Sequence, residues 1–135
     1  AECGGLILLA RRLCLEGADE VELAGVLPVD LRLFSRPQGH GYVELLVERD
    51  NLFFRRGTRL RGHEFHHAQL LAPPGPNETV FAVERGVGCG AGRDGLQRGN
   101  VLACFTHLHA RATPEWAPAL VAAAEKYRQS GRGSN

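Results

Sequence analysis

The sequence has no methionine at any of its 135 positions, the first included. It also has no apolar run that approaches the ~18 residues of a membrane-spanning helix, and no secretory signal peptide is visible. A chain without a natural start is expected to be a fragment of a longer protein. The absence of an apolar span predicts that the chain has no membrane partner.

Excess charge is missing as well, since 16 basic and 15 acidic residues leave a net charge of +1. Proteins that bind nucleic acid through phosphate contacts carry a basic surplus, so no nucleic-acid partner is expected. The four cysteines (Cys3, Cys14, Cys89 and Cys104) include no Cys-x-x-Cys pair. Widely spaced cysteines in a chain that is not cysteine-rich predict a reduced, cytoplasmic setting.

Turn signals and apolar patterning predict one α/β domain, with a helix, several strands and a final helix. The expected elements are a helix over 4–16, one strand or two short strands around Pro28 over 21–34, strands over 41–48, 79–84 and 101–106, and a helix over 117–128 with Thr113 as its cap and Pro114 at its first position. Residues 59–71 fit either a strand or a helix. Residues 86–99 are rich enough in glycine to predict a loop, and residues 130–135 a frayed tail.

The first five residues, Ala1-Glu2-Cys3-Gly4-Gly5, have the pattern small-x-Cys-x-Gly. A nucleophile on a tight turn between a strand and a helix needs small residues two positions before and after it, because the chain segments cross closely there. A helix that starts just after Cys3 would favour its thiolate. His107 follows the predicted strand 101–106, so both side chains would lie at one sheet edge, where the imidazole accepts the thiol proton. A buried, unreactive Cys3 is the alternative on these residues alone.

Several segments occur in an order that resembles the glutaminase domains of the cobyrinic acid a,c-diamide synthase family. They are Ala1 to Leu6, Gly41-Tyr42-Val43-Glu44, Arg61-Gly62-His63-Glu64-Phe65-His66, Arg93-Asp94-Gly95-Leu96, Gly99 to Ala103 and His107-Leu108-His109. The resemblance implies a class I glutamine amidotransferase domain with an α/β, flavodoxin-like fold. Residues 1–135 would be the C-terminal part of that domain, truncated at its N-terminus.

The resemblance also implies the roles of the site residues. Cys3 would attack the side-chain amide of glutamine, form a thioester and release ammonia, while His107 raises the nucleophilicity of the thiol. The backbone N–H of Gly4 would be one donor to the oxyanion, and the second would come from upstream of residue 1. Many relatives carry a carboxylate where His109 stands, so we expect a Cys-His dyad with His109 beside it. The equal alternative for His109 is a partly buried imidazole that is hydrogen-bonded to the backbone.

The complete enzyme would have partners that this chain lacks. The resemblance implies an upstream domain that binds ATP and Mg²⁺ and activates a substrate carboxylate, and it implies no cofactor site in residues 1–135, which alone are expected to be inactive. The acceptor would be cobyrinate, amidated on its a and c acetate side chains. Another tetrapyrrole, such as sirohydrochlorin or its nickel form, stays open, and so does a homodimer.

A zinc hydrolase is the alternative of another class. Residues 63–67 match His-Glu-x-x-His, in which two histidines on one helical face bind zinc and the glutamate is the base. Gly62 before the motif and Pro73-Pro74 after it oppose a helix. We therefore expect His63, Glu64 and His66 to line the active cleft or to form a structural hydrogen-bond cluster. A non-catalytic remnant that binds a partner is disfavoured, because both catalytic candidates are present.

Overall fold

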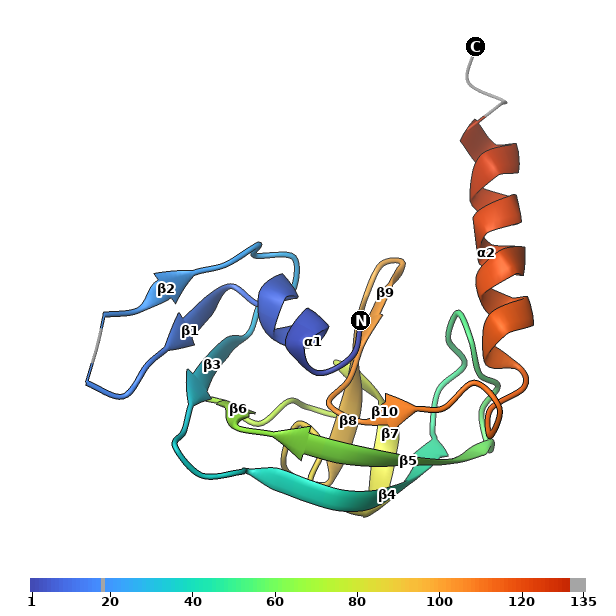
Figure 1. Ribbon diagram of the computed structural model, residues 1–135. Helices are drawn as coiled ribbons and strands as arrows, with labels where there is room; N and C mark the ends of the chain where they lie inside the picture. Colours follow the sequence, from blue (N-terminus) through green and yellow to red (C-terminus); the bar gives the residue numbers. More distant parts are fainter. Residues whose placement is uncertain (18, 132–135) are drawn as a thin grey trace.

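The computed structural model describes residues 1–17 and 19–131. Within these residues, two helices and ten strands form an α/β fold with two sheets (Figure 1). In chain order the elements are α1 (Gly4–Leu9), β1 (Arg12–Cys14), β2 (Val21–Glu22), β3 (Asp30–Leu33), β4 (Gly39–Val47), β5 (Arg59–His66), β6 (Ala68–Leu70), β7 (Thr79–Arg85), β8 (Arg93–Arg98), β9 (Val101–Ala103), β10 (His107–Leu108) and α2 (Trp116–Gly131). No helix in this described part is both long and apolar enough to cross a bilayer.

The larger sheet is antiparallel, with the strand order β10-β5-β4-β7-β8-β9. The smaller sheet has the order β2-β1-β3-β6 and is mixed, because β1 and β3 run parallel. Buried apolar side chains form two clusters. One packs α1 against the smaller sheet, and the other consists mainly of side chains from the larger sheet. In Figure 1, α1 lies near the start of the chain above the larger sheet, while α2 projects away from both sheets.

The predicted helix over residues 4–16 is wrong beyond Leu9, because the chain turns there into β1. Residues 12–14 pair in parallel with β3, and the guanidinium groups of Arg11 and Arg12 bind the carboxylate of Asp30 at 2.6 and 2.8 Å. The hydrogen bonds from these two arginines hold the pKa of Asp30 well below its usual range. Strand pairing and ion pairs between distant residues thus override the local helical pattern.

The loop predicted over residues 86–99 is also wrong in part, since residues 93–98 form β8. Gly95 has φ of 71°, and a Cβ at this position would lie 2.4 Å from Cδ2 of Phe81 on β7. This glycine is therefore needed for the close approach of two strands rather than for a reversal of the chain. Glycine density predicts loops poorly where the glycines serve strand packing.

The other predicted elements are confirmed with shifted bounds. Residues 21–34 form two short strands, and the ambiguous segment 59–71 forms β5 and β6. The last helix begins at Trp116, and the hydroxyl of Thr113 donates to the carbonyl of His109 at 2.9 Å instead of capping the helix. The ring of Trp116 stacks on Phe53, with 6.3 Å between ring centroids. The predicted tail includes residues 130 and 131 of α2, and its remainder, 132–135, lies outside the described residues.

A buried carboxylate fixes the segment that leads into β10. Asp94 has no exposed surface, and its oxygens accept hydrogen bonds from the backbone N–H groups of Gly95, Phe105 and Thr106 at 2.9 to 3.1 Å. The hydroxyl of Thr106 donates to the same carboxylate at 2.7 Å, and the thiol of Cys89 donates at 3.1 Å. A buried carboxylate satisfied by several donors orders the backbone around it. Asp94 therefore sets the position at which His107 begins β10.

Replacing Asp94 by asparagine should destabilise the domain, because the amide N–H₂ then faces backbone N–H donors that keep no acceptor. One unsatisfied buried donor costs roughly 1–3 kcal/mol, and thermal unfolding of the full-length protein measures this loss. Asp50→Asn is the matched control: Asp50 is exposed and accepts one N–H from Arg56, so its change should stay below about 0.5 kcal/mol. Equal effects of the two substitutions would contradict the role given to Asp94.

Residues 63–66 of the His-Glu-x-x-His segment lie on β5 and His67 follows at a bend, so the segment is not helical. Side chains alternate across a strand, so His63 is exposed on one face while Glu64 and His66 are buried on the other, each 2 % exposed. At ~3.3 Å per residue, His63 and His66 are about 10 Å apart along β5, and His67 lies at the bend beyond it. Two zinc ligands lie within ~2.1 Å of one ion, so the strand does not provide the helical geometry that the zinc motif requires.

Purified full-length protein should consequently contain no stoichiometric zinc bound at this segment. Metal analysis by mass spectrometry after gel filtration, on the wild type and on His63→Ala, checks this. The two proteins should have the same metal content. One tightly held zinc per chain that disappears in His63→Ala would restore the metal-hydrolase hypothesis.

Candidate active site

Cys3 lies at a strained turn between a short extended segment and α1. Its N–H donates to the carbonyl of Cys104 at 2.8 Å, and the N–H of Cys104 donates to the carbonyl of Ala1 at 3.1 Å. Residues 1–3 thus run parallel to the segment that leaves β9. Cys3 has φ of 46° and ψ of −104°, a region that costs a residue other than glycine about 1–3 kcal/mol and that is concentrated at active sites.

The small residues of the elbow pattern meet as the sequence predicts. A Cβ placed on Gly5 would lie 3.2 Å from the Cβ of Ala1, which is closer than ordinary van der Waals contact. Gly4 is the first residue of α1 and directly follows Cys3. The residues two before and two after Cys3 are therefore adjacent in space, as a nucleophile elbow requires.

The thiol of Cys3 is partly exposed and donates to the carbonyl of Phe65 on β5 at 3.7 Å. Burial raises its pKa above the ordinary value, the N–H of Gly4 lowers it, and the charge of Glu2 raises it again; the net direction is upward. The N–H at the start of α1 thus favours the thiolate as expected, but burial outweighs it, so the expectation of a favoured thiolate is wrong for the net pKa. At neutral pH the thiol stays protonated and needs a base to become nucleophilic.

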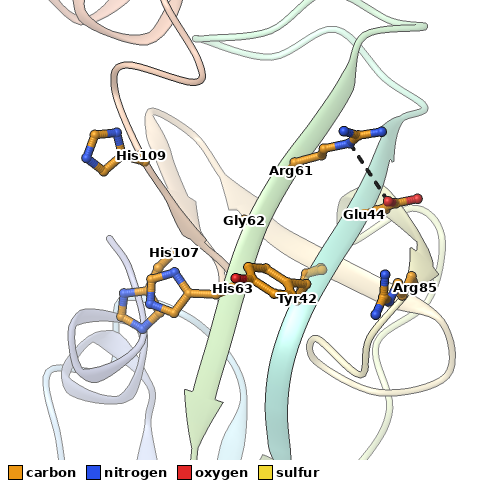
Figure 2. A pocket seen from close by; sticks show the side chains of 9 residues that line it. Tyr42, Glu44, Arg61, Gly62, His63, Arg85, His107 and His109 are labelled. Carbon is orange, nitrogen blue, oxygen red and sulfur yellow. Dashed lines mark ion pairs between the residues drawn. The ribbon is translucent and has the colours of Figure 1, made fainter.

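His107 is the first residue of β10 and lies opposite His63 of β5. The two imidazole rings stack with 4.9 Å between their centroids and 12° between their planes, and Figure 2 shows the two rings lying against each other. The side chain of His107 is one-third exposed. A half-buried imidazole with an open face can exchange a proton with a neighbouring group.

Glu2 connects the elbow with β10. One oxygen of its carboxylate accepts the N–H of Leu108 at 3.2 Å, and the other lies 4.0 Å from Nδ1 of His107. Residues 1–3 and the segment around Cys104 run in the same direction. Cys3 and His107 therefore both follow the same end of this parallel pair. Within residues 1–17 and 19–131, no hydrogen bond joins the thiol of Cys3 to the imidazole of His107. Such bonds are often long before substrate binds.

A groove of about 450 Å³ adjoins His107 on the outer face of the larger sheet (Figure 2). Its floor has one cross-strand row of His107, His63 and Tyr42, and a second row of Arg61, Glu44 and Arg85. Arg61 and Glu44 form an ion pair at 3.8 Å. The groove therefore offers aromatic and charged groups next to the imidazole.

The remaining predicted site residues divide between this groove and the interior. His63 and His109 line the groove, and Nδ1 of the exposed His109 accepts the N–H of Arg111 at 3.2 Å. Glu64 and His66 do not line it. Glu64 accepts the N–H groups of Val87 and Gly88 at 2.8 Å.

The buried pair Glu64 and His66 forms the structural cluster named as one of the two expectations. Nε2 of His66 lies 3.4 Å from the carboxylate of Glu64, and Nδ1 lies 2.7 Å from the carbonyl of Ala68. Strand alternation turns both side chains inward, so neither of them lines the groove at His107.

Two residues near the site were missed by the sequence analysis. Asp94 and Glu2 both stand inside the segments that carry the resemblance, yet neither received a role. The position next to Cys3 was the available signal for Glu2, but its partners at residues 107 and 108 are distant in the sequence. Within the part of the chain that the structure describes, no group of three or more histidine, cysteine or acidic side chains could hold a metal ion.

Comparison with known proteins places this geometry in a family. Residues 1–115 match the CobB/CobQ-like glutamine amidotransferase domain. The chain is 41% identical over 112 residues to cobyrinate a,c-diamide synthase of Halobacterium salinarum, covering 83% of this chain and 25% of that protein. It is 35% identical over 120 residues to the enzyme of the same name in Magnetococcus marinus, covering 89% and 26%.

A third relative, cobyrinate a,c-diamide synthase of Methanothermobacter thermautotrophicus, is 38% identical over 116 residues, which covers 86% of this chain and 25% of that protein. The chain spans about a quarter of the length of these curated relatives. The family match begins at the elbow, includes the whole groove and ends just before α2. The chain therefore belongs to the family of CobB/CobQ-like glutamine amidotransferase domains.

Proposed function

We propose that this domain hydrolyses glutamine and supplies the ammonia with which a larger enzyme amidates a cobyrinate-type tetrapyrrole. The observation that carries the proposal is the strained elbow at Cys3, which pairs with Cys104, three residues before His107, in a chain of this family. The curated relatives are named cobyrinate a,c-diamide synthase, which supports cobyrinate, on its a and c acetate groups, as the acceptor.

In the proposed reaction, His107 takes the proton of the Cys3 thiol, and the sulfur attacks the carboxamide carbon of glutamine. The C–N bond of the tetrahedral intermediate breaks, and the imidazolium returns the proton to the nitrogen as ammonia leaves. A water molecule, deprotonated by His107, then attacks the thioester and releases glutamate with the free thiol. The raised pKa of Cys3 makes the base essential, because little thiolate forms without it.

The negative oxygen of each tetrahedral intermediate needs donors that already point at it. The N–H of Gly4 follows the nucleophile at the start of α1, where backbone N–H groups lack intrahelical acceptors. This position suits Gly4 as the first donor. A second donor would come from outside these 135 residues.

Activation of the acceptor carboxylate with ATP and Mg²⁺ would belong to another domain of the complete enzyme. Ammonia would pass from the groove at His107 to that domain. Assays of the full-length protein with cobyrinate and with sirohydrochlorin would identify the tetrapyrrole, since only the true acceptor yields an amide.

Cys3→Ala in the full-length protein should abolish amidation that depends on glutamine and preserve amidation that depends on added ammonium. The reason is that Cys3 serves only to release ammonia. Product formation with each nitrogen donor, followed by mass spectrometry, checks the prediction. Cys14→Ala, a change at a thiol on β1 away from the elbow, is the matched control and should preserve both activities. Equal loss with both donors in Cys3→Ala would show a different role for Cys3.

His107→Asn should slow thioester formation by ~10²–10⁴-fold, which is the usual contribution of a general base. His109→Asn should have a much smaller effect, because His109 is exposed and its Nδ1 already accepts a backbone N–H. Rapid-quench measurement of the thioester formed from labelled glutamine compares the two variants. Similar losses would instead indicate a relay through both histidines.

A further inference from the structure

We propose that Glu2 is the positioning residue that orients His107. His109 stands where many relatives carry an orienting carboxylate, and Glu2 takes the role of that carboxylate here. This inference rests on the proposed glutaminase function and adds a residue to it. The orienting carboxylate then stands just before Cys3, at residue 2, rather than two positions after His107, at residue 109. Glu2 acts through His107 and does not itself contact glutamine.

The contacts of Glu2 carry the inference. One carboxylate oxygen is fixed by the N–H of Leu108 at 3.2 Å, and the other lies 4.0 Å from Nδ1 of His107. The anchored oxygen acts as a pivot, so rotation of the carboxylate about it can move the second oxygen toward the imidazole. A closing movement of ~1 Å brings the pair to hydrogen-bond distance. Catalytic hydrogen bonds commonly shorten in this way when substrate binds.

The other charged and titratable groups near His107 are engaged elsewhere. Glu44 pairs with Arg61, and Nδ1 of His109 accepts a backbone N–H. His63 stacks on His107 face to face, so its ring nitrogens do not point at those of His107. Within the described residues, Glu2 is therefore the one carboxylate within ion-pair distance of this imidazole.

An acceptor at Nδ1 has a defined consequence for the reaction. When Nδ1–H donates to Glu2, the neutral imidazole keeps its lone pair on Nε2, the nitrogen that can take the thiol proton. After the transfer, the carboxylate also stabilises the imidazolium. The neighbouring ring of His63 cannot supply this stabilisation, because an imidazole offers no negative charge.

The effect of Glu2 on Cys3 itself works in the opposite direction. The charge of Glu2 contributes to raising the pKa of the thiol, which disfavours the nucleophilic form. A carboxylate placed next to the nucleophile thus opposes activation of the thiol by direct electrostatics. Any benefit of Glu2 to catalysis must therefore come through His107. The experiment consequently measures the coupling between Glu2 and His107.

The test is a double-mutant cycle between Glu2→Gln and His107→Asn in the full-length protein. Glutamine at residue 2 keeps an oxygen to accept the N–H of Leu108 but removes the charge. Glu2→Gln alone should lower kcat for glutamine by about 10- to 10²-fold and leave KM unchanged. This is less than the ~10⁴-fold effect of altering the carboxylate of a buried triad, because the Glu2 side chain is 38 % exposed. In the His107→Asn background, Glu2→Gln should cause no further loss.

Two controls accompany the cycle. Amidation with added ammonium should stay at the wild-type rate in Glu2→Gln, which shows that the protein is folded. Glu84→Gln is the matched substitution, because Glu84 is a partly exposed carboxylate that pairs with Arg59 outside the groove, and it should leave kcat unchanged.

The outcomes separate this inference from the proposed function. Wild-type kcat in Glu2→Gln, or a full further loss in the His107→Asn background, would overturn the role of Glu2 while leaving the glutaminase proposal intact. Loss of ammonium-dependent amidation in Glu2→Gln would also overturn it, because the effect would then be structural. Cys3→Ala, assayed in parallel, tests the glutaminase function itself.

Discussion

The short parallel pairing of residues 1–3 with the segment that leaves β9 is the interaction on which the rest of the site depends. Two backbone hydrogen bonds between the segments fix the direction in which Cys3 enters α1. The same pairing places Glu2 beside β10. Without it, the strained backbone of Cys3 would have nothing to hold it, since such conformations persist only where the surroundings enforce them.

The position of His107 depends on a second constraint, which reaches the same segment from inside the protein. The carboxylate of Asp94 collects donors from residues 105 and 106, while β5 pairs with β10 from the side. Cys3 and His107 are thus held by separate interactions, one at the elbow and one in the core. A change at either place can alter the distance between the two groups without touching either of them.

Local physical rules explain which parts of this arrangement could be predicted. The elbow follows from steric demands within five consecutive residues, so its pattern predicts the close contact of Ala1 and Gly5. The end of α1 at Leu9 could not be predicted in the same way, because Asp30 and β3 determine it. Glu2 gains its role only through pairing with residues about 100 positions away, and no local pattern carries that information.

The junction between the family domain and α2 has an optical consequence. Trp116 is the single tryptophan of the sequence, and it stacks on Phe53 where α2 leaves the body of the domain. All indole fluorescence of this chain therefore originates at one point, next to the apolar cavity that also includes Leu102, Cys104 and Leu108. Emission from this domain acts as an intrinsic reporter of the packing behind the elbow, without any attached dye.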